Sequence, residues 1–321
     1  MLPEHYDAAR NHAAVVRQDW MGLLKLSSPE RQSWLQGMVT NEVEKLAPGQ
    51  GCYAGHLNAQ GRLVAQMIVL ITEEDVWLLV ERSATAKLAA VFDKLIIMED
   101  VQVRDTSDEY AVLGLIGPKA AEVLKTWSGT TLPNTPLYRH LSTSYGRIIS
   151  TDLGFTVIVP REDADRYLRE LTAAGAVEVD QDTWNIVRTE AGLPQYGIDI
   201  DETTTLPEVG PRGISYDKGC YIGQEVVARI KYIGHVNRCF VGVICEGLVI
   251  PDIRSTVQMN GKDVGYVTTG VLSPGLGKPV ALGFVNRASA EPGTAVVVAG
   301  KRGPISAVIA SLPLLPIRYE D

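Results

Sequence analysis

The fold is decided by LLKLSSP at residues 23–29 and by LGLIGP at residues 113–118, because the two stretches repeat one unit. Each stretch is a short apolar strand that ends in a turn and a proline. A proline at this point is typical of a helix start, which predicts helices over residues 30–38 and 119–127. The chain therefore contains the same strand–turn–helix unit twice.

The duplication continues beyond these units. Residues 61–64 (GRLV) and 146–149 (GRII) open the next part of each copy, and each leads to an apolar strand, over residues 76–80 and 155–159. A predicted helix follows in both copies, with apolar side chains at helical spacing. These side chains are Ala84, Leu88, Val91, Phe92 and Leu95 in the first helix, and Ala164, Tyr167, Leu168 and Leu171 in the second. The match predicts two related α+β halves with a cleft between them.

The character of the sequence changes after about residue 235. Short apolar runs separated by glycine and proline cover residues 240–244, 264–269, 280–285, 295–298 and 305–309. Asn260-Gly261 lies between apolar runs, and this dipeptide is a strong signal for a two-residue hairpin turn. Residues 236–321 are therefore expected to form a small antiparallel β-barrel or sandwich.

Length and charge limit the classes of protein to consider. At 321 residues the chain is longer than one hydrophobic core supports, so more than one packed unit is expected. The formal net charge of −8 disfavours a protein whose main task is nucleic-acid binding, because that task needs a broad positive surface. No apolar run approaches the roughly 18 residues that cross a bilayer, and the N-terminus has no apolar signal segment. We expect a cytoplasmic monomer with no membrane contact.

The cysteines indicate a reducing compartment. Cys52, Cys220, Cys239 and Cys245 form no CxxC pair, and the chain contains only five histidines. This pattern supports neither a zinc site nor a disulfide framework. Thiols that stay reduced are typical of the cytosol.

The octapeptide KGCYIGQE is the stretch that most clearly indicates chemistry. It consists of Lys218, Gly219, Cys220, Tyr221, Ile222, Gly223, Gln224 and Glu225. Gly223 is expected to precede a helix, and Gln224 and Glu225 suit its positive first turn. A thiol near a helix start and a lysine has a lowered pKa, which makes Cys220 a candidate reactive thiol with Lys218 beside it. The alternative is that Cys220 is a small buried hydrophobe and that the glycines only permit a tight turn.

This octapeptide, with Arg229 after it and RTEAGLPQYGIDI at residues 188–200 before it, resembles the YgfZ-type folate-binding proteins. They are relatives of the glycine-cleavage T-protein that are linked to iron–sulfur cluster assembly. The likeness covers nearly the whole chain and implies two interleaved α+β lobes and a C-terminal barrel around a folate-sized opening. The implied division is residues 1–50 with 106–140 and 190–235, residues 51–105 with 141–189, and a barrel over residues 236–321.

The resemblance also implies binding residues for a tetrahydrofolate or a one-carbon derivative. A folate has a flat pterin with a donor–acceptor edge and an anionic tail, so its site needs a carboxylate, an aromatic wall and a cation. The candidates are Glu190 and Glu208 at the pterin edge, Tyr196 beside the ring, Arg229 at the tail, and Thr40 and Asn41 lining the opening. The structural alternatives are a helix-end carboxylate for Glu190, a solvated helix face for Arg229 and a helix stop for Asn41.

Whether the protein is an enzyme is left open by the sequence. The T-protein enzyme uses an aspartate in a segment that contains Asn-Ala, whereas the comparable residues 79–88 read LVERSATAKL. The departure favours a tetrahydrofolate-binding accessory protein that supports assembly or repair of iron–sulfur clusters in client enzymes and affects tRNA modification indirectly. Cys220 would contribute redox or transient ligand chemistry, and no stable metal is expected because one thiol cannot hold a cluster.

The alternative is a tetrahydrofolate-dependent aminomethyltransferase or demethylase that acts on a small amine or sulfonium donor. In that case another carboxylate would replace the missing aspartate, and Glu81 and Asp93 are the candidates.

Overall fold

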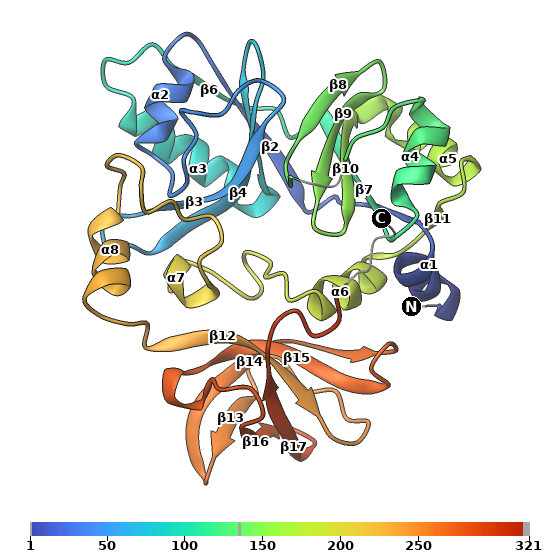
Figure 1. Cartoon of the computed structure of the whole chain (residues 1–321), viewed down its shortest axis with the longest axis vertical. Coiled ribbons are helices and arrows are strands. Elements are labelled where there is room, and N and C mark those ends of the chain that lie inside the picture. The colour runs from blue at the N-terminus through green and yellow to red at the C-terminus, as the bar shows by residue number, and fades with distance from the viewer. Residues whose placement is uncertain (1, 134–135, 317–321) are drawn as a thin grey trace.

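The computed structural model describes residues 2–133 and 136–316. These residues form two α+β lobes side by side and a barrel below them, joined by a helical connecting segment (Figure 1). Within the described part of the chain, no helix is long and apolar enough to cross a membrane.

The first lobe, residues 21–105, is a sheet with helices packed against it. Its elements are β2 (Met21–Ser27), α2 (Arg31–Gln36), β3 (Gly51–Leu57), β4 (Leu63–Ile71), β5 (Val76–Glu81), α3 (Arg82–Leu95) and β6 (Gln102–Asp105). The strands lie in the order β3-β4-β5-β2-β6. Phe92 of α3 is fully buried against this sheet.

The second lobe, residues 110–178 with the N-terminal residues, repeats this arrangement. Its elements are α1 (Pro3–Asn11), β1 (Ala14–Arg17), β7 (Tyr110–Ile116), α4 (Ala120–Ser128), β8 (His140–Thr143), β9 (Gly146–Thr151), β10 (Gly154–Pro160), η1 (Arg161–Asp163), α5 (Ala164–Ala173) and β11 (Val177–Glu178). The strand order is β8-β9-β10-β7-β1-β11. Apart from the inserted β1, this order matches the first lobe strand for strand, which agrees with the predicted duplication.

The sheets agree with the interleaved division expected from the resemblance where β1 pairs with β7, and they group other segments differently. Strand β2 pairs with β5 and β6, so residues 21–50 belong with residues 51–105. Strand β7 pairs with β10, so residues 110–116 belong with the segment after residue 141. Each copy forms a sheet of its own, and the first strand of each copy, β2 or β7, lies inside that sheet and not at its edge.

The two sheets face each other across an apolar interface. Leu23, Leu79 and Trp77 of the first sheet pack against Ile149 and Ile158 of the second. The outer face of each sheet is covered by that lobe's own helices (Figure 1).

The C-terminal unit is a closed antiparallel barrel, as expected. Its elements are β12 (Arg238–Cys245), β13 (Thr256–Met259), β14 (Lys262–Ser273), β15 (Lys278–Asn286), η2 (Arg287–Ser289), β16 (Ala295–Gly300) and β17 (Gly303–Ala310), in the order β12-β15-β14-β13-β16-β17. Asn260 and Gly261 join β13 to β14 with φ of 52° and 74°. Positive φ at both central residues is the turn that this dipeptide predicts.

The connecting segment lies between the lobes and the barrel (Figure 1). It contains α6 (Gln181–Glu190), α7 (Leu206–Val209) and α8 (Gln224–Tyr232). Helix α8 begins directly after Gly223, as predicted.

Candidate functional site

A cavity of about 230 Å³, here called the central cavity, lies where both lobes meet the connecting segment. Strands β3, β4 and β5 line one side and the turn between β9 and β10 lines another. The remaining lining comes from α6, α7 and loop residues that include Gln18, Tyr138, Pro194 and Arg212. The lining residues that matter below are Tyr53, Gln66, Glu81, Tyr138, Asp152, Trp184, Val209 and Arg212. The walls are thus largely apolar and aromatic, with a few polar groups placed among them.

Glu81 is a carboxylate in the wall of this cavity, which Asp152 also lines. Glu81 ends β5 and is only 8% exposed. Its Oε1 accepts a hydrogen bond from Gln66 Nε2 at 3.1 Å and another from the backbone N–H of Tyr196 at 3.3 Å. Burial raises the pKa of Glu81 to about 7, although these hydrogen bonds oppose the rise. Near neutral pH the carboxyl group is present in both protonation states, which suits general acid–base catalysis.

Gln66 holds Glu81 in position. The Tyr53 hydroxyl donates to Gln66 Oε1 at 2.5 Å, and the Gln66 amide donates to Glu81 and to the carbonyl of Pro194 at 3.3 Å. The orientation of the amide is set by these contacts, because a tyrosine hydroxyl that donates needs the oxygen side. Burial raises the pKa of Tyr53, so this hydroxyl keeps its proton at neutral pH.

A cation, Arg212, also lines the central cavity. The Arg212 guanidinium contacts the carboxylate of Asp152 and the hydroxyl of Tyr138, and its Cζ lies 5.0 Å from the ring centroid of Tyr53. Burial raises the pKa of Asp152 to about 6, and the charge of Arg212 acts in the opposite sense. The Arg212 side chain is 41% exposed, so its charge is accessible from solvent.

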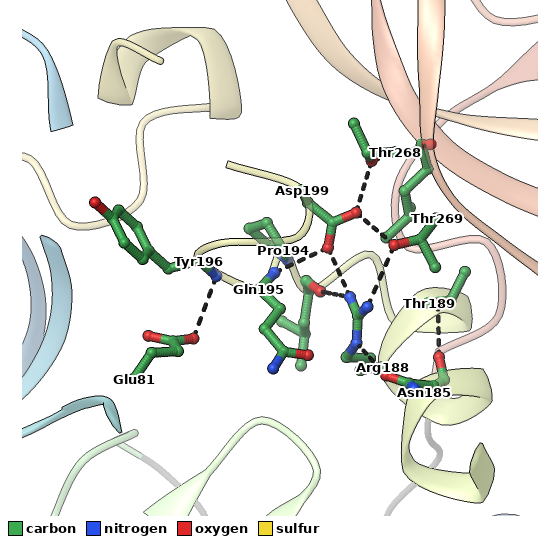
Figure 2. Close-up of polar contacts among 12 residues, drawn as sticks. Glu81, Asn185, Arg188, Thr189, Pro194, Gln195, Tyr196, Asp199, Thr268 and Thr269 are labelled. Atoms are coloured by element: carbon green, nitrogen blue, oxygen red, sulfur yellow. Dashed lines mark hydrogen bonds and ion pairs between the residues drawn. The ribbon is translucent and has the colours of Figure 1, made fainter. Parts of the chain in front are cut away.

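A buried ion pair fixes the loop that reaches Glu81 (Figure 2). Arg188 Nη1 lies 2.7 Å from Asp199 Oδ2, and the side chains are 3% and 0% exposed. Asp199 Oδ1 accepts from the hydroxyls of Thr268 and Thr269, both at 2.6 Å, which ties the loop to β14 of the barrel. The loop between Arg188 and Asp199 presents the backbone N–H of Tyr196 to the carboxylate of Glu81.

The quoted sequence RTEAGLPQYGIDI contains Arg188 and Asp199, but their pairing was not predicted. The segment contains one arginine and two carboxylates, Glu190 and Asp199, among largely apolar and glycine residues, and the sequence does not tell which carboxylate pairs with Arg188. A charge among such residues is often buried and paired.

The structure places Glu190 outside the lining of the central cavity. Its carboxylate is fully buried and accepts from the Tyr6 hydroxyl at 2.8 Å and from Ser273 Oγ at 2.5 Å. Arg10 Nη1 lies 3.7 Å away. Tyr6, Ser273 and Arg10 thus satisfy the oxygens of Glu190. The carboxylate links α6, which carries it, to α1 and β14.

Glu208, Tyr196 and Arg229 also lie outside the cavity lining. Glu208 accepts from the Thr205 N–H at 2.8 Å and pairs with Arg238 Nε at 2.9 Å, which joins α7 to the barrel. The Tyr196 ring packs into the cores of the first lobe and connecting segment, and only its backbone reaches Glu81. Arg229 is exposed on α8, in keeping with the structural alternative of a solvated helix face.

Thr40 and Asn41 lie close to the opening. Thr40 Oγ1 donates to the Gly213 carbonyl at 2.5 Å and accepts from the Gly55 N–H at 2.9 Å, so it fixes the backbone after Arg212. Asn41 lines an adjoining cavity of about 360 Å³ that shares Tyr53, Tyr138, Asp152 and Arg212 with the central one. Asn41 therefore lies beside the central cavity, and a role of Thr40 and Asn41 in folate binding stays a prediction.

Lys218 holds a loop of the first lobe. Its Nζ donates to the carbonyls of Gln36, Val39 and Asn41 at 2.6, 2.6 and 2.7 Å, and burial lowers its pKa to about 8. Burial raises the pKa of the half-buried Cys52 thiol to about 12, and the charge of Lys218 opposes this rise.

The rest of the octapeptide docks α8 onto the first lobe. Tyr221 is buried with Leu57 and Leu206, and Gly223 takes the positive φ of 83° that the helix entry requires. Gly219, Cys220 and Glu225 are exposed, and Gln224 begins α8. Cys220 is therefore an accessible thiol outside the central cavity, and the alternative of a buried hydrophobe does not hold for it.

Of the carboxylates expected to replace the missing aspartate, Glu81 lies in the cavity and Asp93 is exposed on α3. Residues 2–133 and 136–316 contain no group of three or more His, Cys, Asp or Glu side chains that could hold a metal ion.

Comparison with known proteins covers both parts of the fold. The GCVT N-terminal domain family matches residues 2–214, and the glycine cleavage T-protein C-terminal barrel domain matches residues 238–315. The aminomethyltransferase of Nostoc sp. is 30% identical, covering 97% of this chain and 87% of the relative. The aminomethyltransferase of Streptomyces avermitilis is 28% identical, covering 92% of this chain and 84% of the relative.

A solved structure shows the same fold. The glycine cleavage system aminomethyltransferase T from Bartonella henselae matches with a TM-score of 0.89 and 23% identity, covering 99% of this chain and 90% of that chain. The finer YgfZ-type assignment stays a prediction.

Proposed function

Since this chain belongs to the glycine cleavage T-protein family, we propose that it binds a tetrahydrofolate in the central cavity and transfers a one-carbon unit from a small amine or sulfonium donor. The observation that carries this proposal is Glu81, a buried carboxyl group with a pKa of about 7 in the wall of that cavity. The aminomethyltransferase names of the relatives support the same class of reaction.

The residues of the central cavity fit a reduced folate. Glu81, oriented by Gln66, offers a carboxylate for the donor side of a pterin edge. Tyr53, Tyr138 and Trp184 offer aromatic walls. Arg212 offers an exposed guanidinium for the carboxylates of the tail, the role expected earlier for Arg229.

The chain's own contribution to the reaction is to position and exchange a proton. A bound tetrahydrofolate supplies the nitrogen atoms that accept a one-carbon unit. The carboxyl group of Glu81 exchanges a proton with the reacting groups, since its protonated and ionised forms are close in free energy at neutral pH. Gln66 and the Tyr196 N–H hold the carboxylate in place, and the apolar walls limit the access of water.

The test is turnover of amine and sulfonium donors with tetrahydrofolate by Glu81→Gln, beside Glu225→Gln as an exposed control on α8. We expect Glu81→Gln to bind folate and to lose about 10²–10⁴-fold in kcat, the usual contribution of a general acid–base group. The wild-type rate is expected to follow an apparent pKa of about 7. Unchanged turnover and an unchanged pH profile in Glu81→Gln would exclude this role.

A second candidate function is the accessory role in iron–sulfur cluster assembly or repair, favoured by the exposed thiol of Cys220. It also agrees with the absence of Asn-Ala and aspartate from residues 79–88. The test compares Cys220→Ser with Cys239→Ser in cells, with the activity of iron–sulfur enzymes as readout. Loss of iron–sulfur enzyme activity with Cys220→Ser, but not with Cys239→Ser or Glu81→Gln, would support this role. Full activity with Cys220→Ser would contradict it.

A further inference from the structure

A second cavity lies at the other end of strand β5. Its volume is about 530 Å³, and we call it the rim cavity. Trp77 near the start of β5 lines it, whereas Glu81 at the end of β5 lines the central cavity. The residues that carry the argument are Lys25, Trp77, His140, Arg147 and the acidic residues of the turn before β5, Glu73, Glu74 and Asp75.

Two cations of the rim cavity share one aromatic ring. Lys25 Nζ lies 4.1 Å and Arg147 Cζ 4.6 Å from the ring centroid of Trp77. Lys25 comes from the first lobe, where it pairs in register with Trp77, and Arg147 comes from β9 of the second. Since both groups lie over one ring, they are at most about 9 Å apart, and like charges at such a distance repel each other, most strongly where water is partly excluded.

Neither cation has a carboxylate partner in the described part of the chain. The Lys25 ammonium donates to the hydroxyl of Tyr110 at 2.8 Å, which is a neutral group. The charge of Asp75 acts on Arg147 and partly offsets the lowering of the arginine pKa by burial, but the two groups form no ion pair.

His140 accepts one hydrogen bond from Arg147 and has no acceptor left for another donor. Arg147 Nη1 lies 2.8 Å from His140 Nδ1, and since arginine can only donate, Nδ1 must be the acceptor. The hydrogen on Nε2 then donates to the Gln50 carbonyl at 3.2 Å. Burial and the charge of Arg147 lower the pKa of His140 to about 4, so the ring is neutral and fully engaged at pH 7.

Two buried donors of the rim cavity lack a partner within the described residues. They are the Nε of Arg147 and the Nε1 of Trp77, a residue that is 8% exposed. Both atoms can only donate hydrogen bonds, so the missing partner must be an acceptor. Native structures rarely leave buried donors without one.

We propose that the rim cavity binds a compact oxyanion, namely the carboxylate or phosphate group of a small molecule. An oxyanion accepts hydrogen bonds from the orphan donors and offsets the repulsion between the two cations. A guanidinium fork matches both carboxylate and phosphate geometry. Glu73 and Glu74 are exposed at the same cavity and repel extended polyanions, so the ligand is small.

The first experiment is calorimetric titration at constant ionic strength with inorganic phosphate, acetate, glycine and tripolyphosphate. We expect saturable binding of phosphate or of a carboxylate, weakened at least tenfold in Lys25→Met and in Arg147→Gln. Arg169→Gln, an exposed arginine on α5, is the matched control and should bind as the wild type does. No saturable binding, equal binding by all variants, or tightest binding of tripolyphosphate would overturn the proposal.

A second readout does not require the cation variants to fold. The indole N–H resonance of Trp77, assigned with Trp77→Phe, should move on addition of the bound anion as the orphan donor gains an acceptor. A resonance that stays in place while the anion binds would place the ligand elsewhere. Glu81→Gln should leave this shift intact, which separates a failure here from a failure of the proposed folate site.

Discussion

Glu81 makes the stability of the protein depend on pH in a defined direction. Its pKa in the folded state is about 7, raised from 4.5, so the folded state binds the proton more tightly than the unfolded state does. The stability associated with the protonated form is therefore complete below pH 4.5 and is lost as the pH rises towards 7. Above that pH the buried charge lowers the free energy of unfolding by about 3 kcal/mol.

Replacing this carboxyl group by an amide should remove the pH dependence. Glu81→Gln is expected to match the wild type in stability at about pH 4 and to exceed it by up to about 3 kcal/mol at about pH 8. Urea unfolding at both pH values measures the difference, with Glu225→Gln as control. If wild type and Glu81→Gln lose the same free energy of unfolding between the two pH values, then Glu81 does not carry a buried charge at the higher pH.

The candidate site residues were only partly predictable from the sequence. Glu81 was named as a replacement carboxylate and lies in the cavity, whereas Glu190 and Arg229 lie outside its lining. The reason is physical: a sequence motif fixes which residues are near each other along the chain, but not which neighbour satisfies a side chain. Tyr6 and Ser273, which hold Glu190, come from opposite ends of the chain.

At the scale of elements, helix α8 depends on the glycine before it. Gly223 has φ of 83°, and a Cβ there would lie 2.7 Å from the Asn58 carbonyl oxygen. Gly223→Ala should destabilise the protein by about 1–3 kcal/mol, because the backbone strain and the clash add up. Gly219→Ala in the same octapeptide meets nothing within 4 Å and should change stability by less than about 0.5 kcal/mol.

Thermal and urea unfolding of both variants tests this contrast. Equal stability of Gly223→Ala and Gly219→Ala would contradict the account of the helix entry. The entry itself was predictable, because Gly223 followed by Gln224 and Glu225 is a local signal.

The loop from α6 to Tyr196 depends on the ion pair between Arg188 and Asp199. Asp199→Ala leaves a buried guanidinium unpaired and should cost about 3–5 kcal/mol. Glu246→Ala, which breaks the exposed pair with Lys278, should cost at most about 1 kcal/mol. Chemical denaturation compares the two, and similar small losses would mean that Arg188 finds water when Asp199 is removed.

At the scale of the whole molecule, the duplication was predictable and the grouping of strands was not. The repeated motifs specify that each copy contains a strand, a helix, further strands and a second helix, and the matching strand orders agree with this. Pairing partners depend on contacts between segments far apart in sequence. Leu23, for example, pairs with Leu79 rather than with a strand of the other copy.

The arrangement of the whole molecule explains where its sites lie. The apolar interface between the sheets leaves the central cavity at one end of β5 and the rim cavity at the other. Glu208 with Arg238, and Asp199 with Thr268 and Thr269, attach the connecting segment to the barrel. The barrel thus supports the central cavity through the segment that closes it.

The most direct test of the folate site is calorimetric titration with tetrahydrofolate of the wild type, Val209→Trp, Arg212→Ala and Arg229→Ala. The account predicts saturable binding that Val209→Trp abolishes by filling the cavity and Arg212→Ala weakens by removing the cation. The exposed Arg229→Ala should bind as the wild type does. Absence of binding, or binding weakened by Arg229→Ala and not by Arg212→Ala or Val209→Trp, would contradict it.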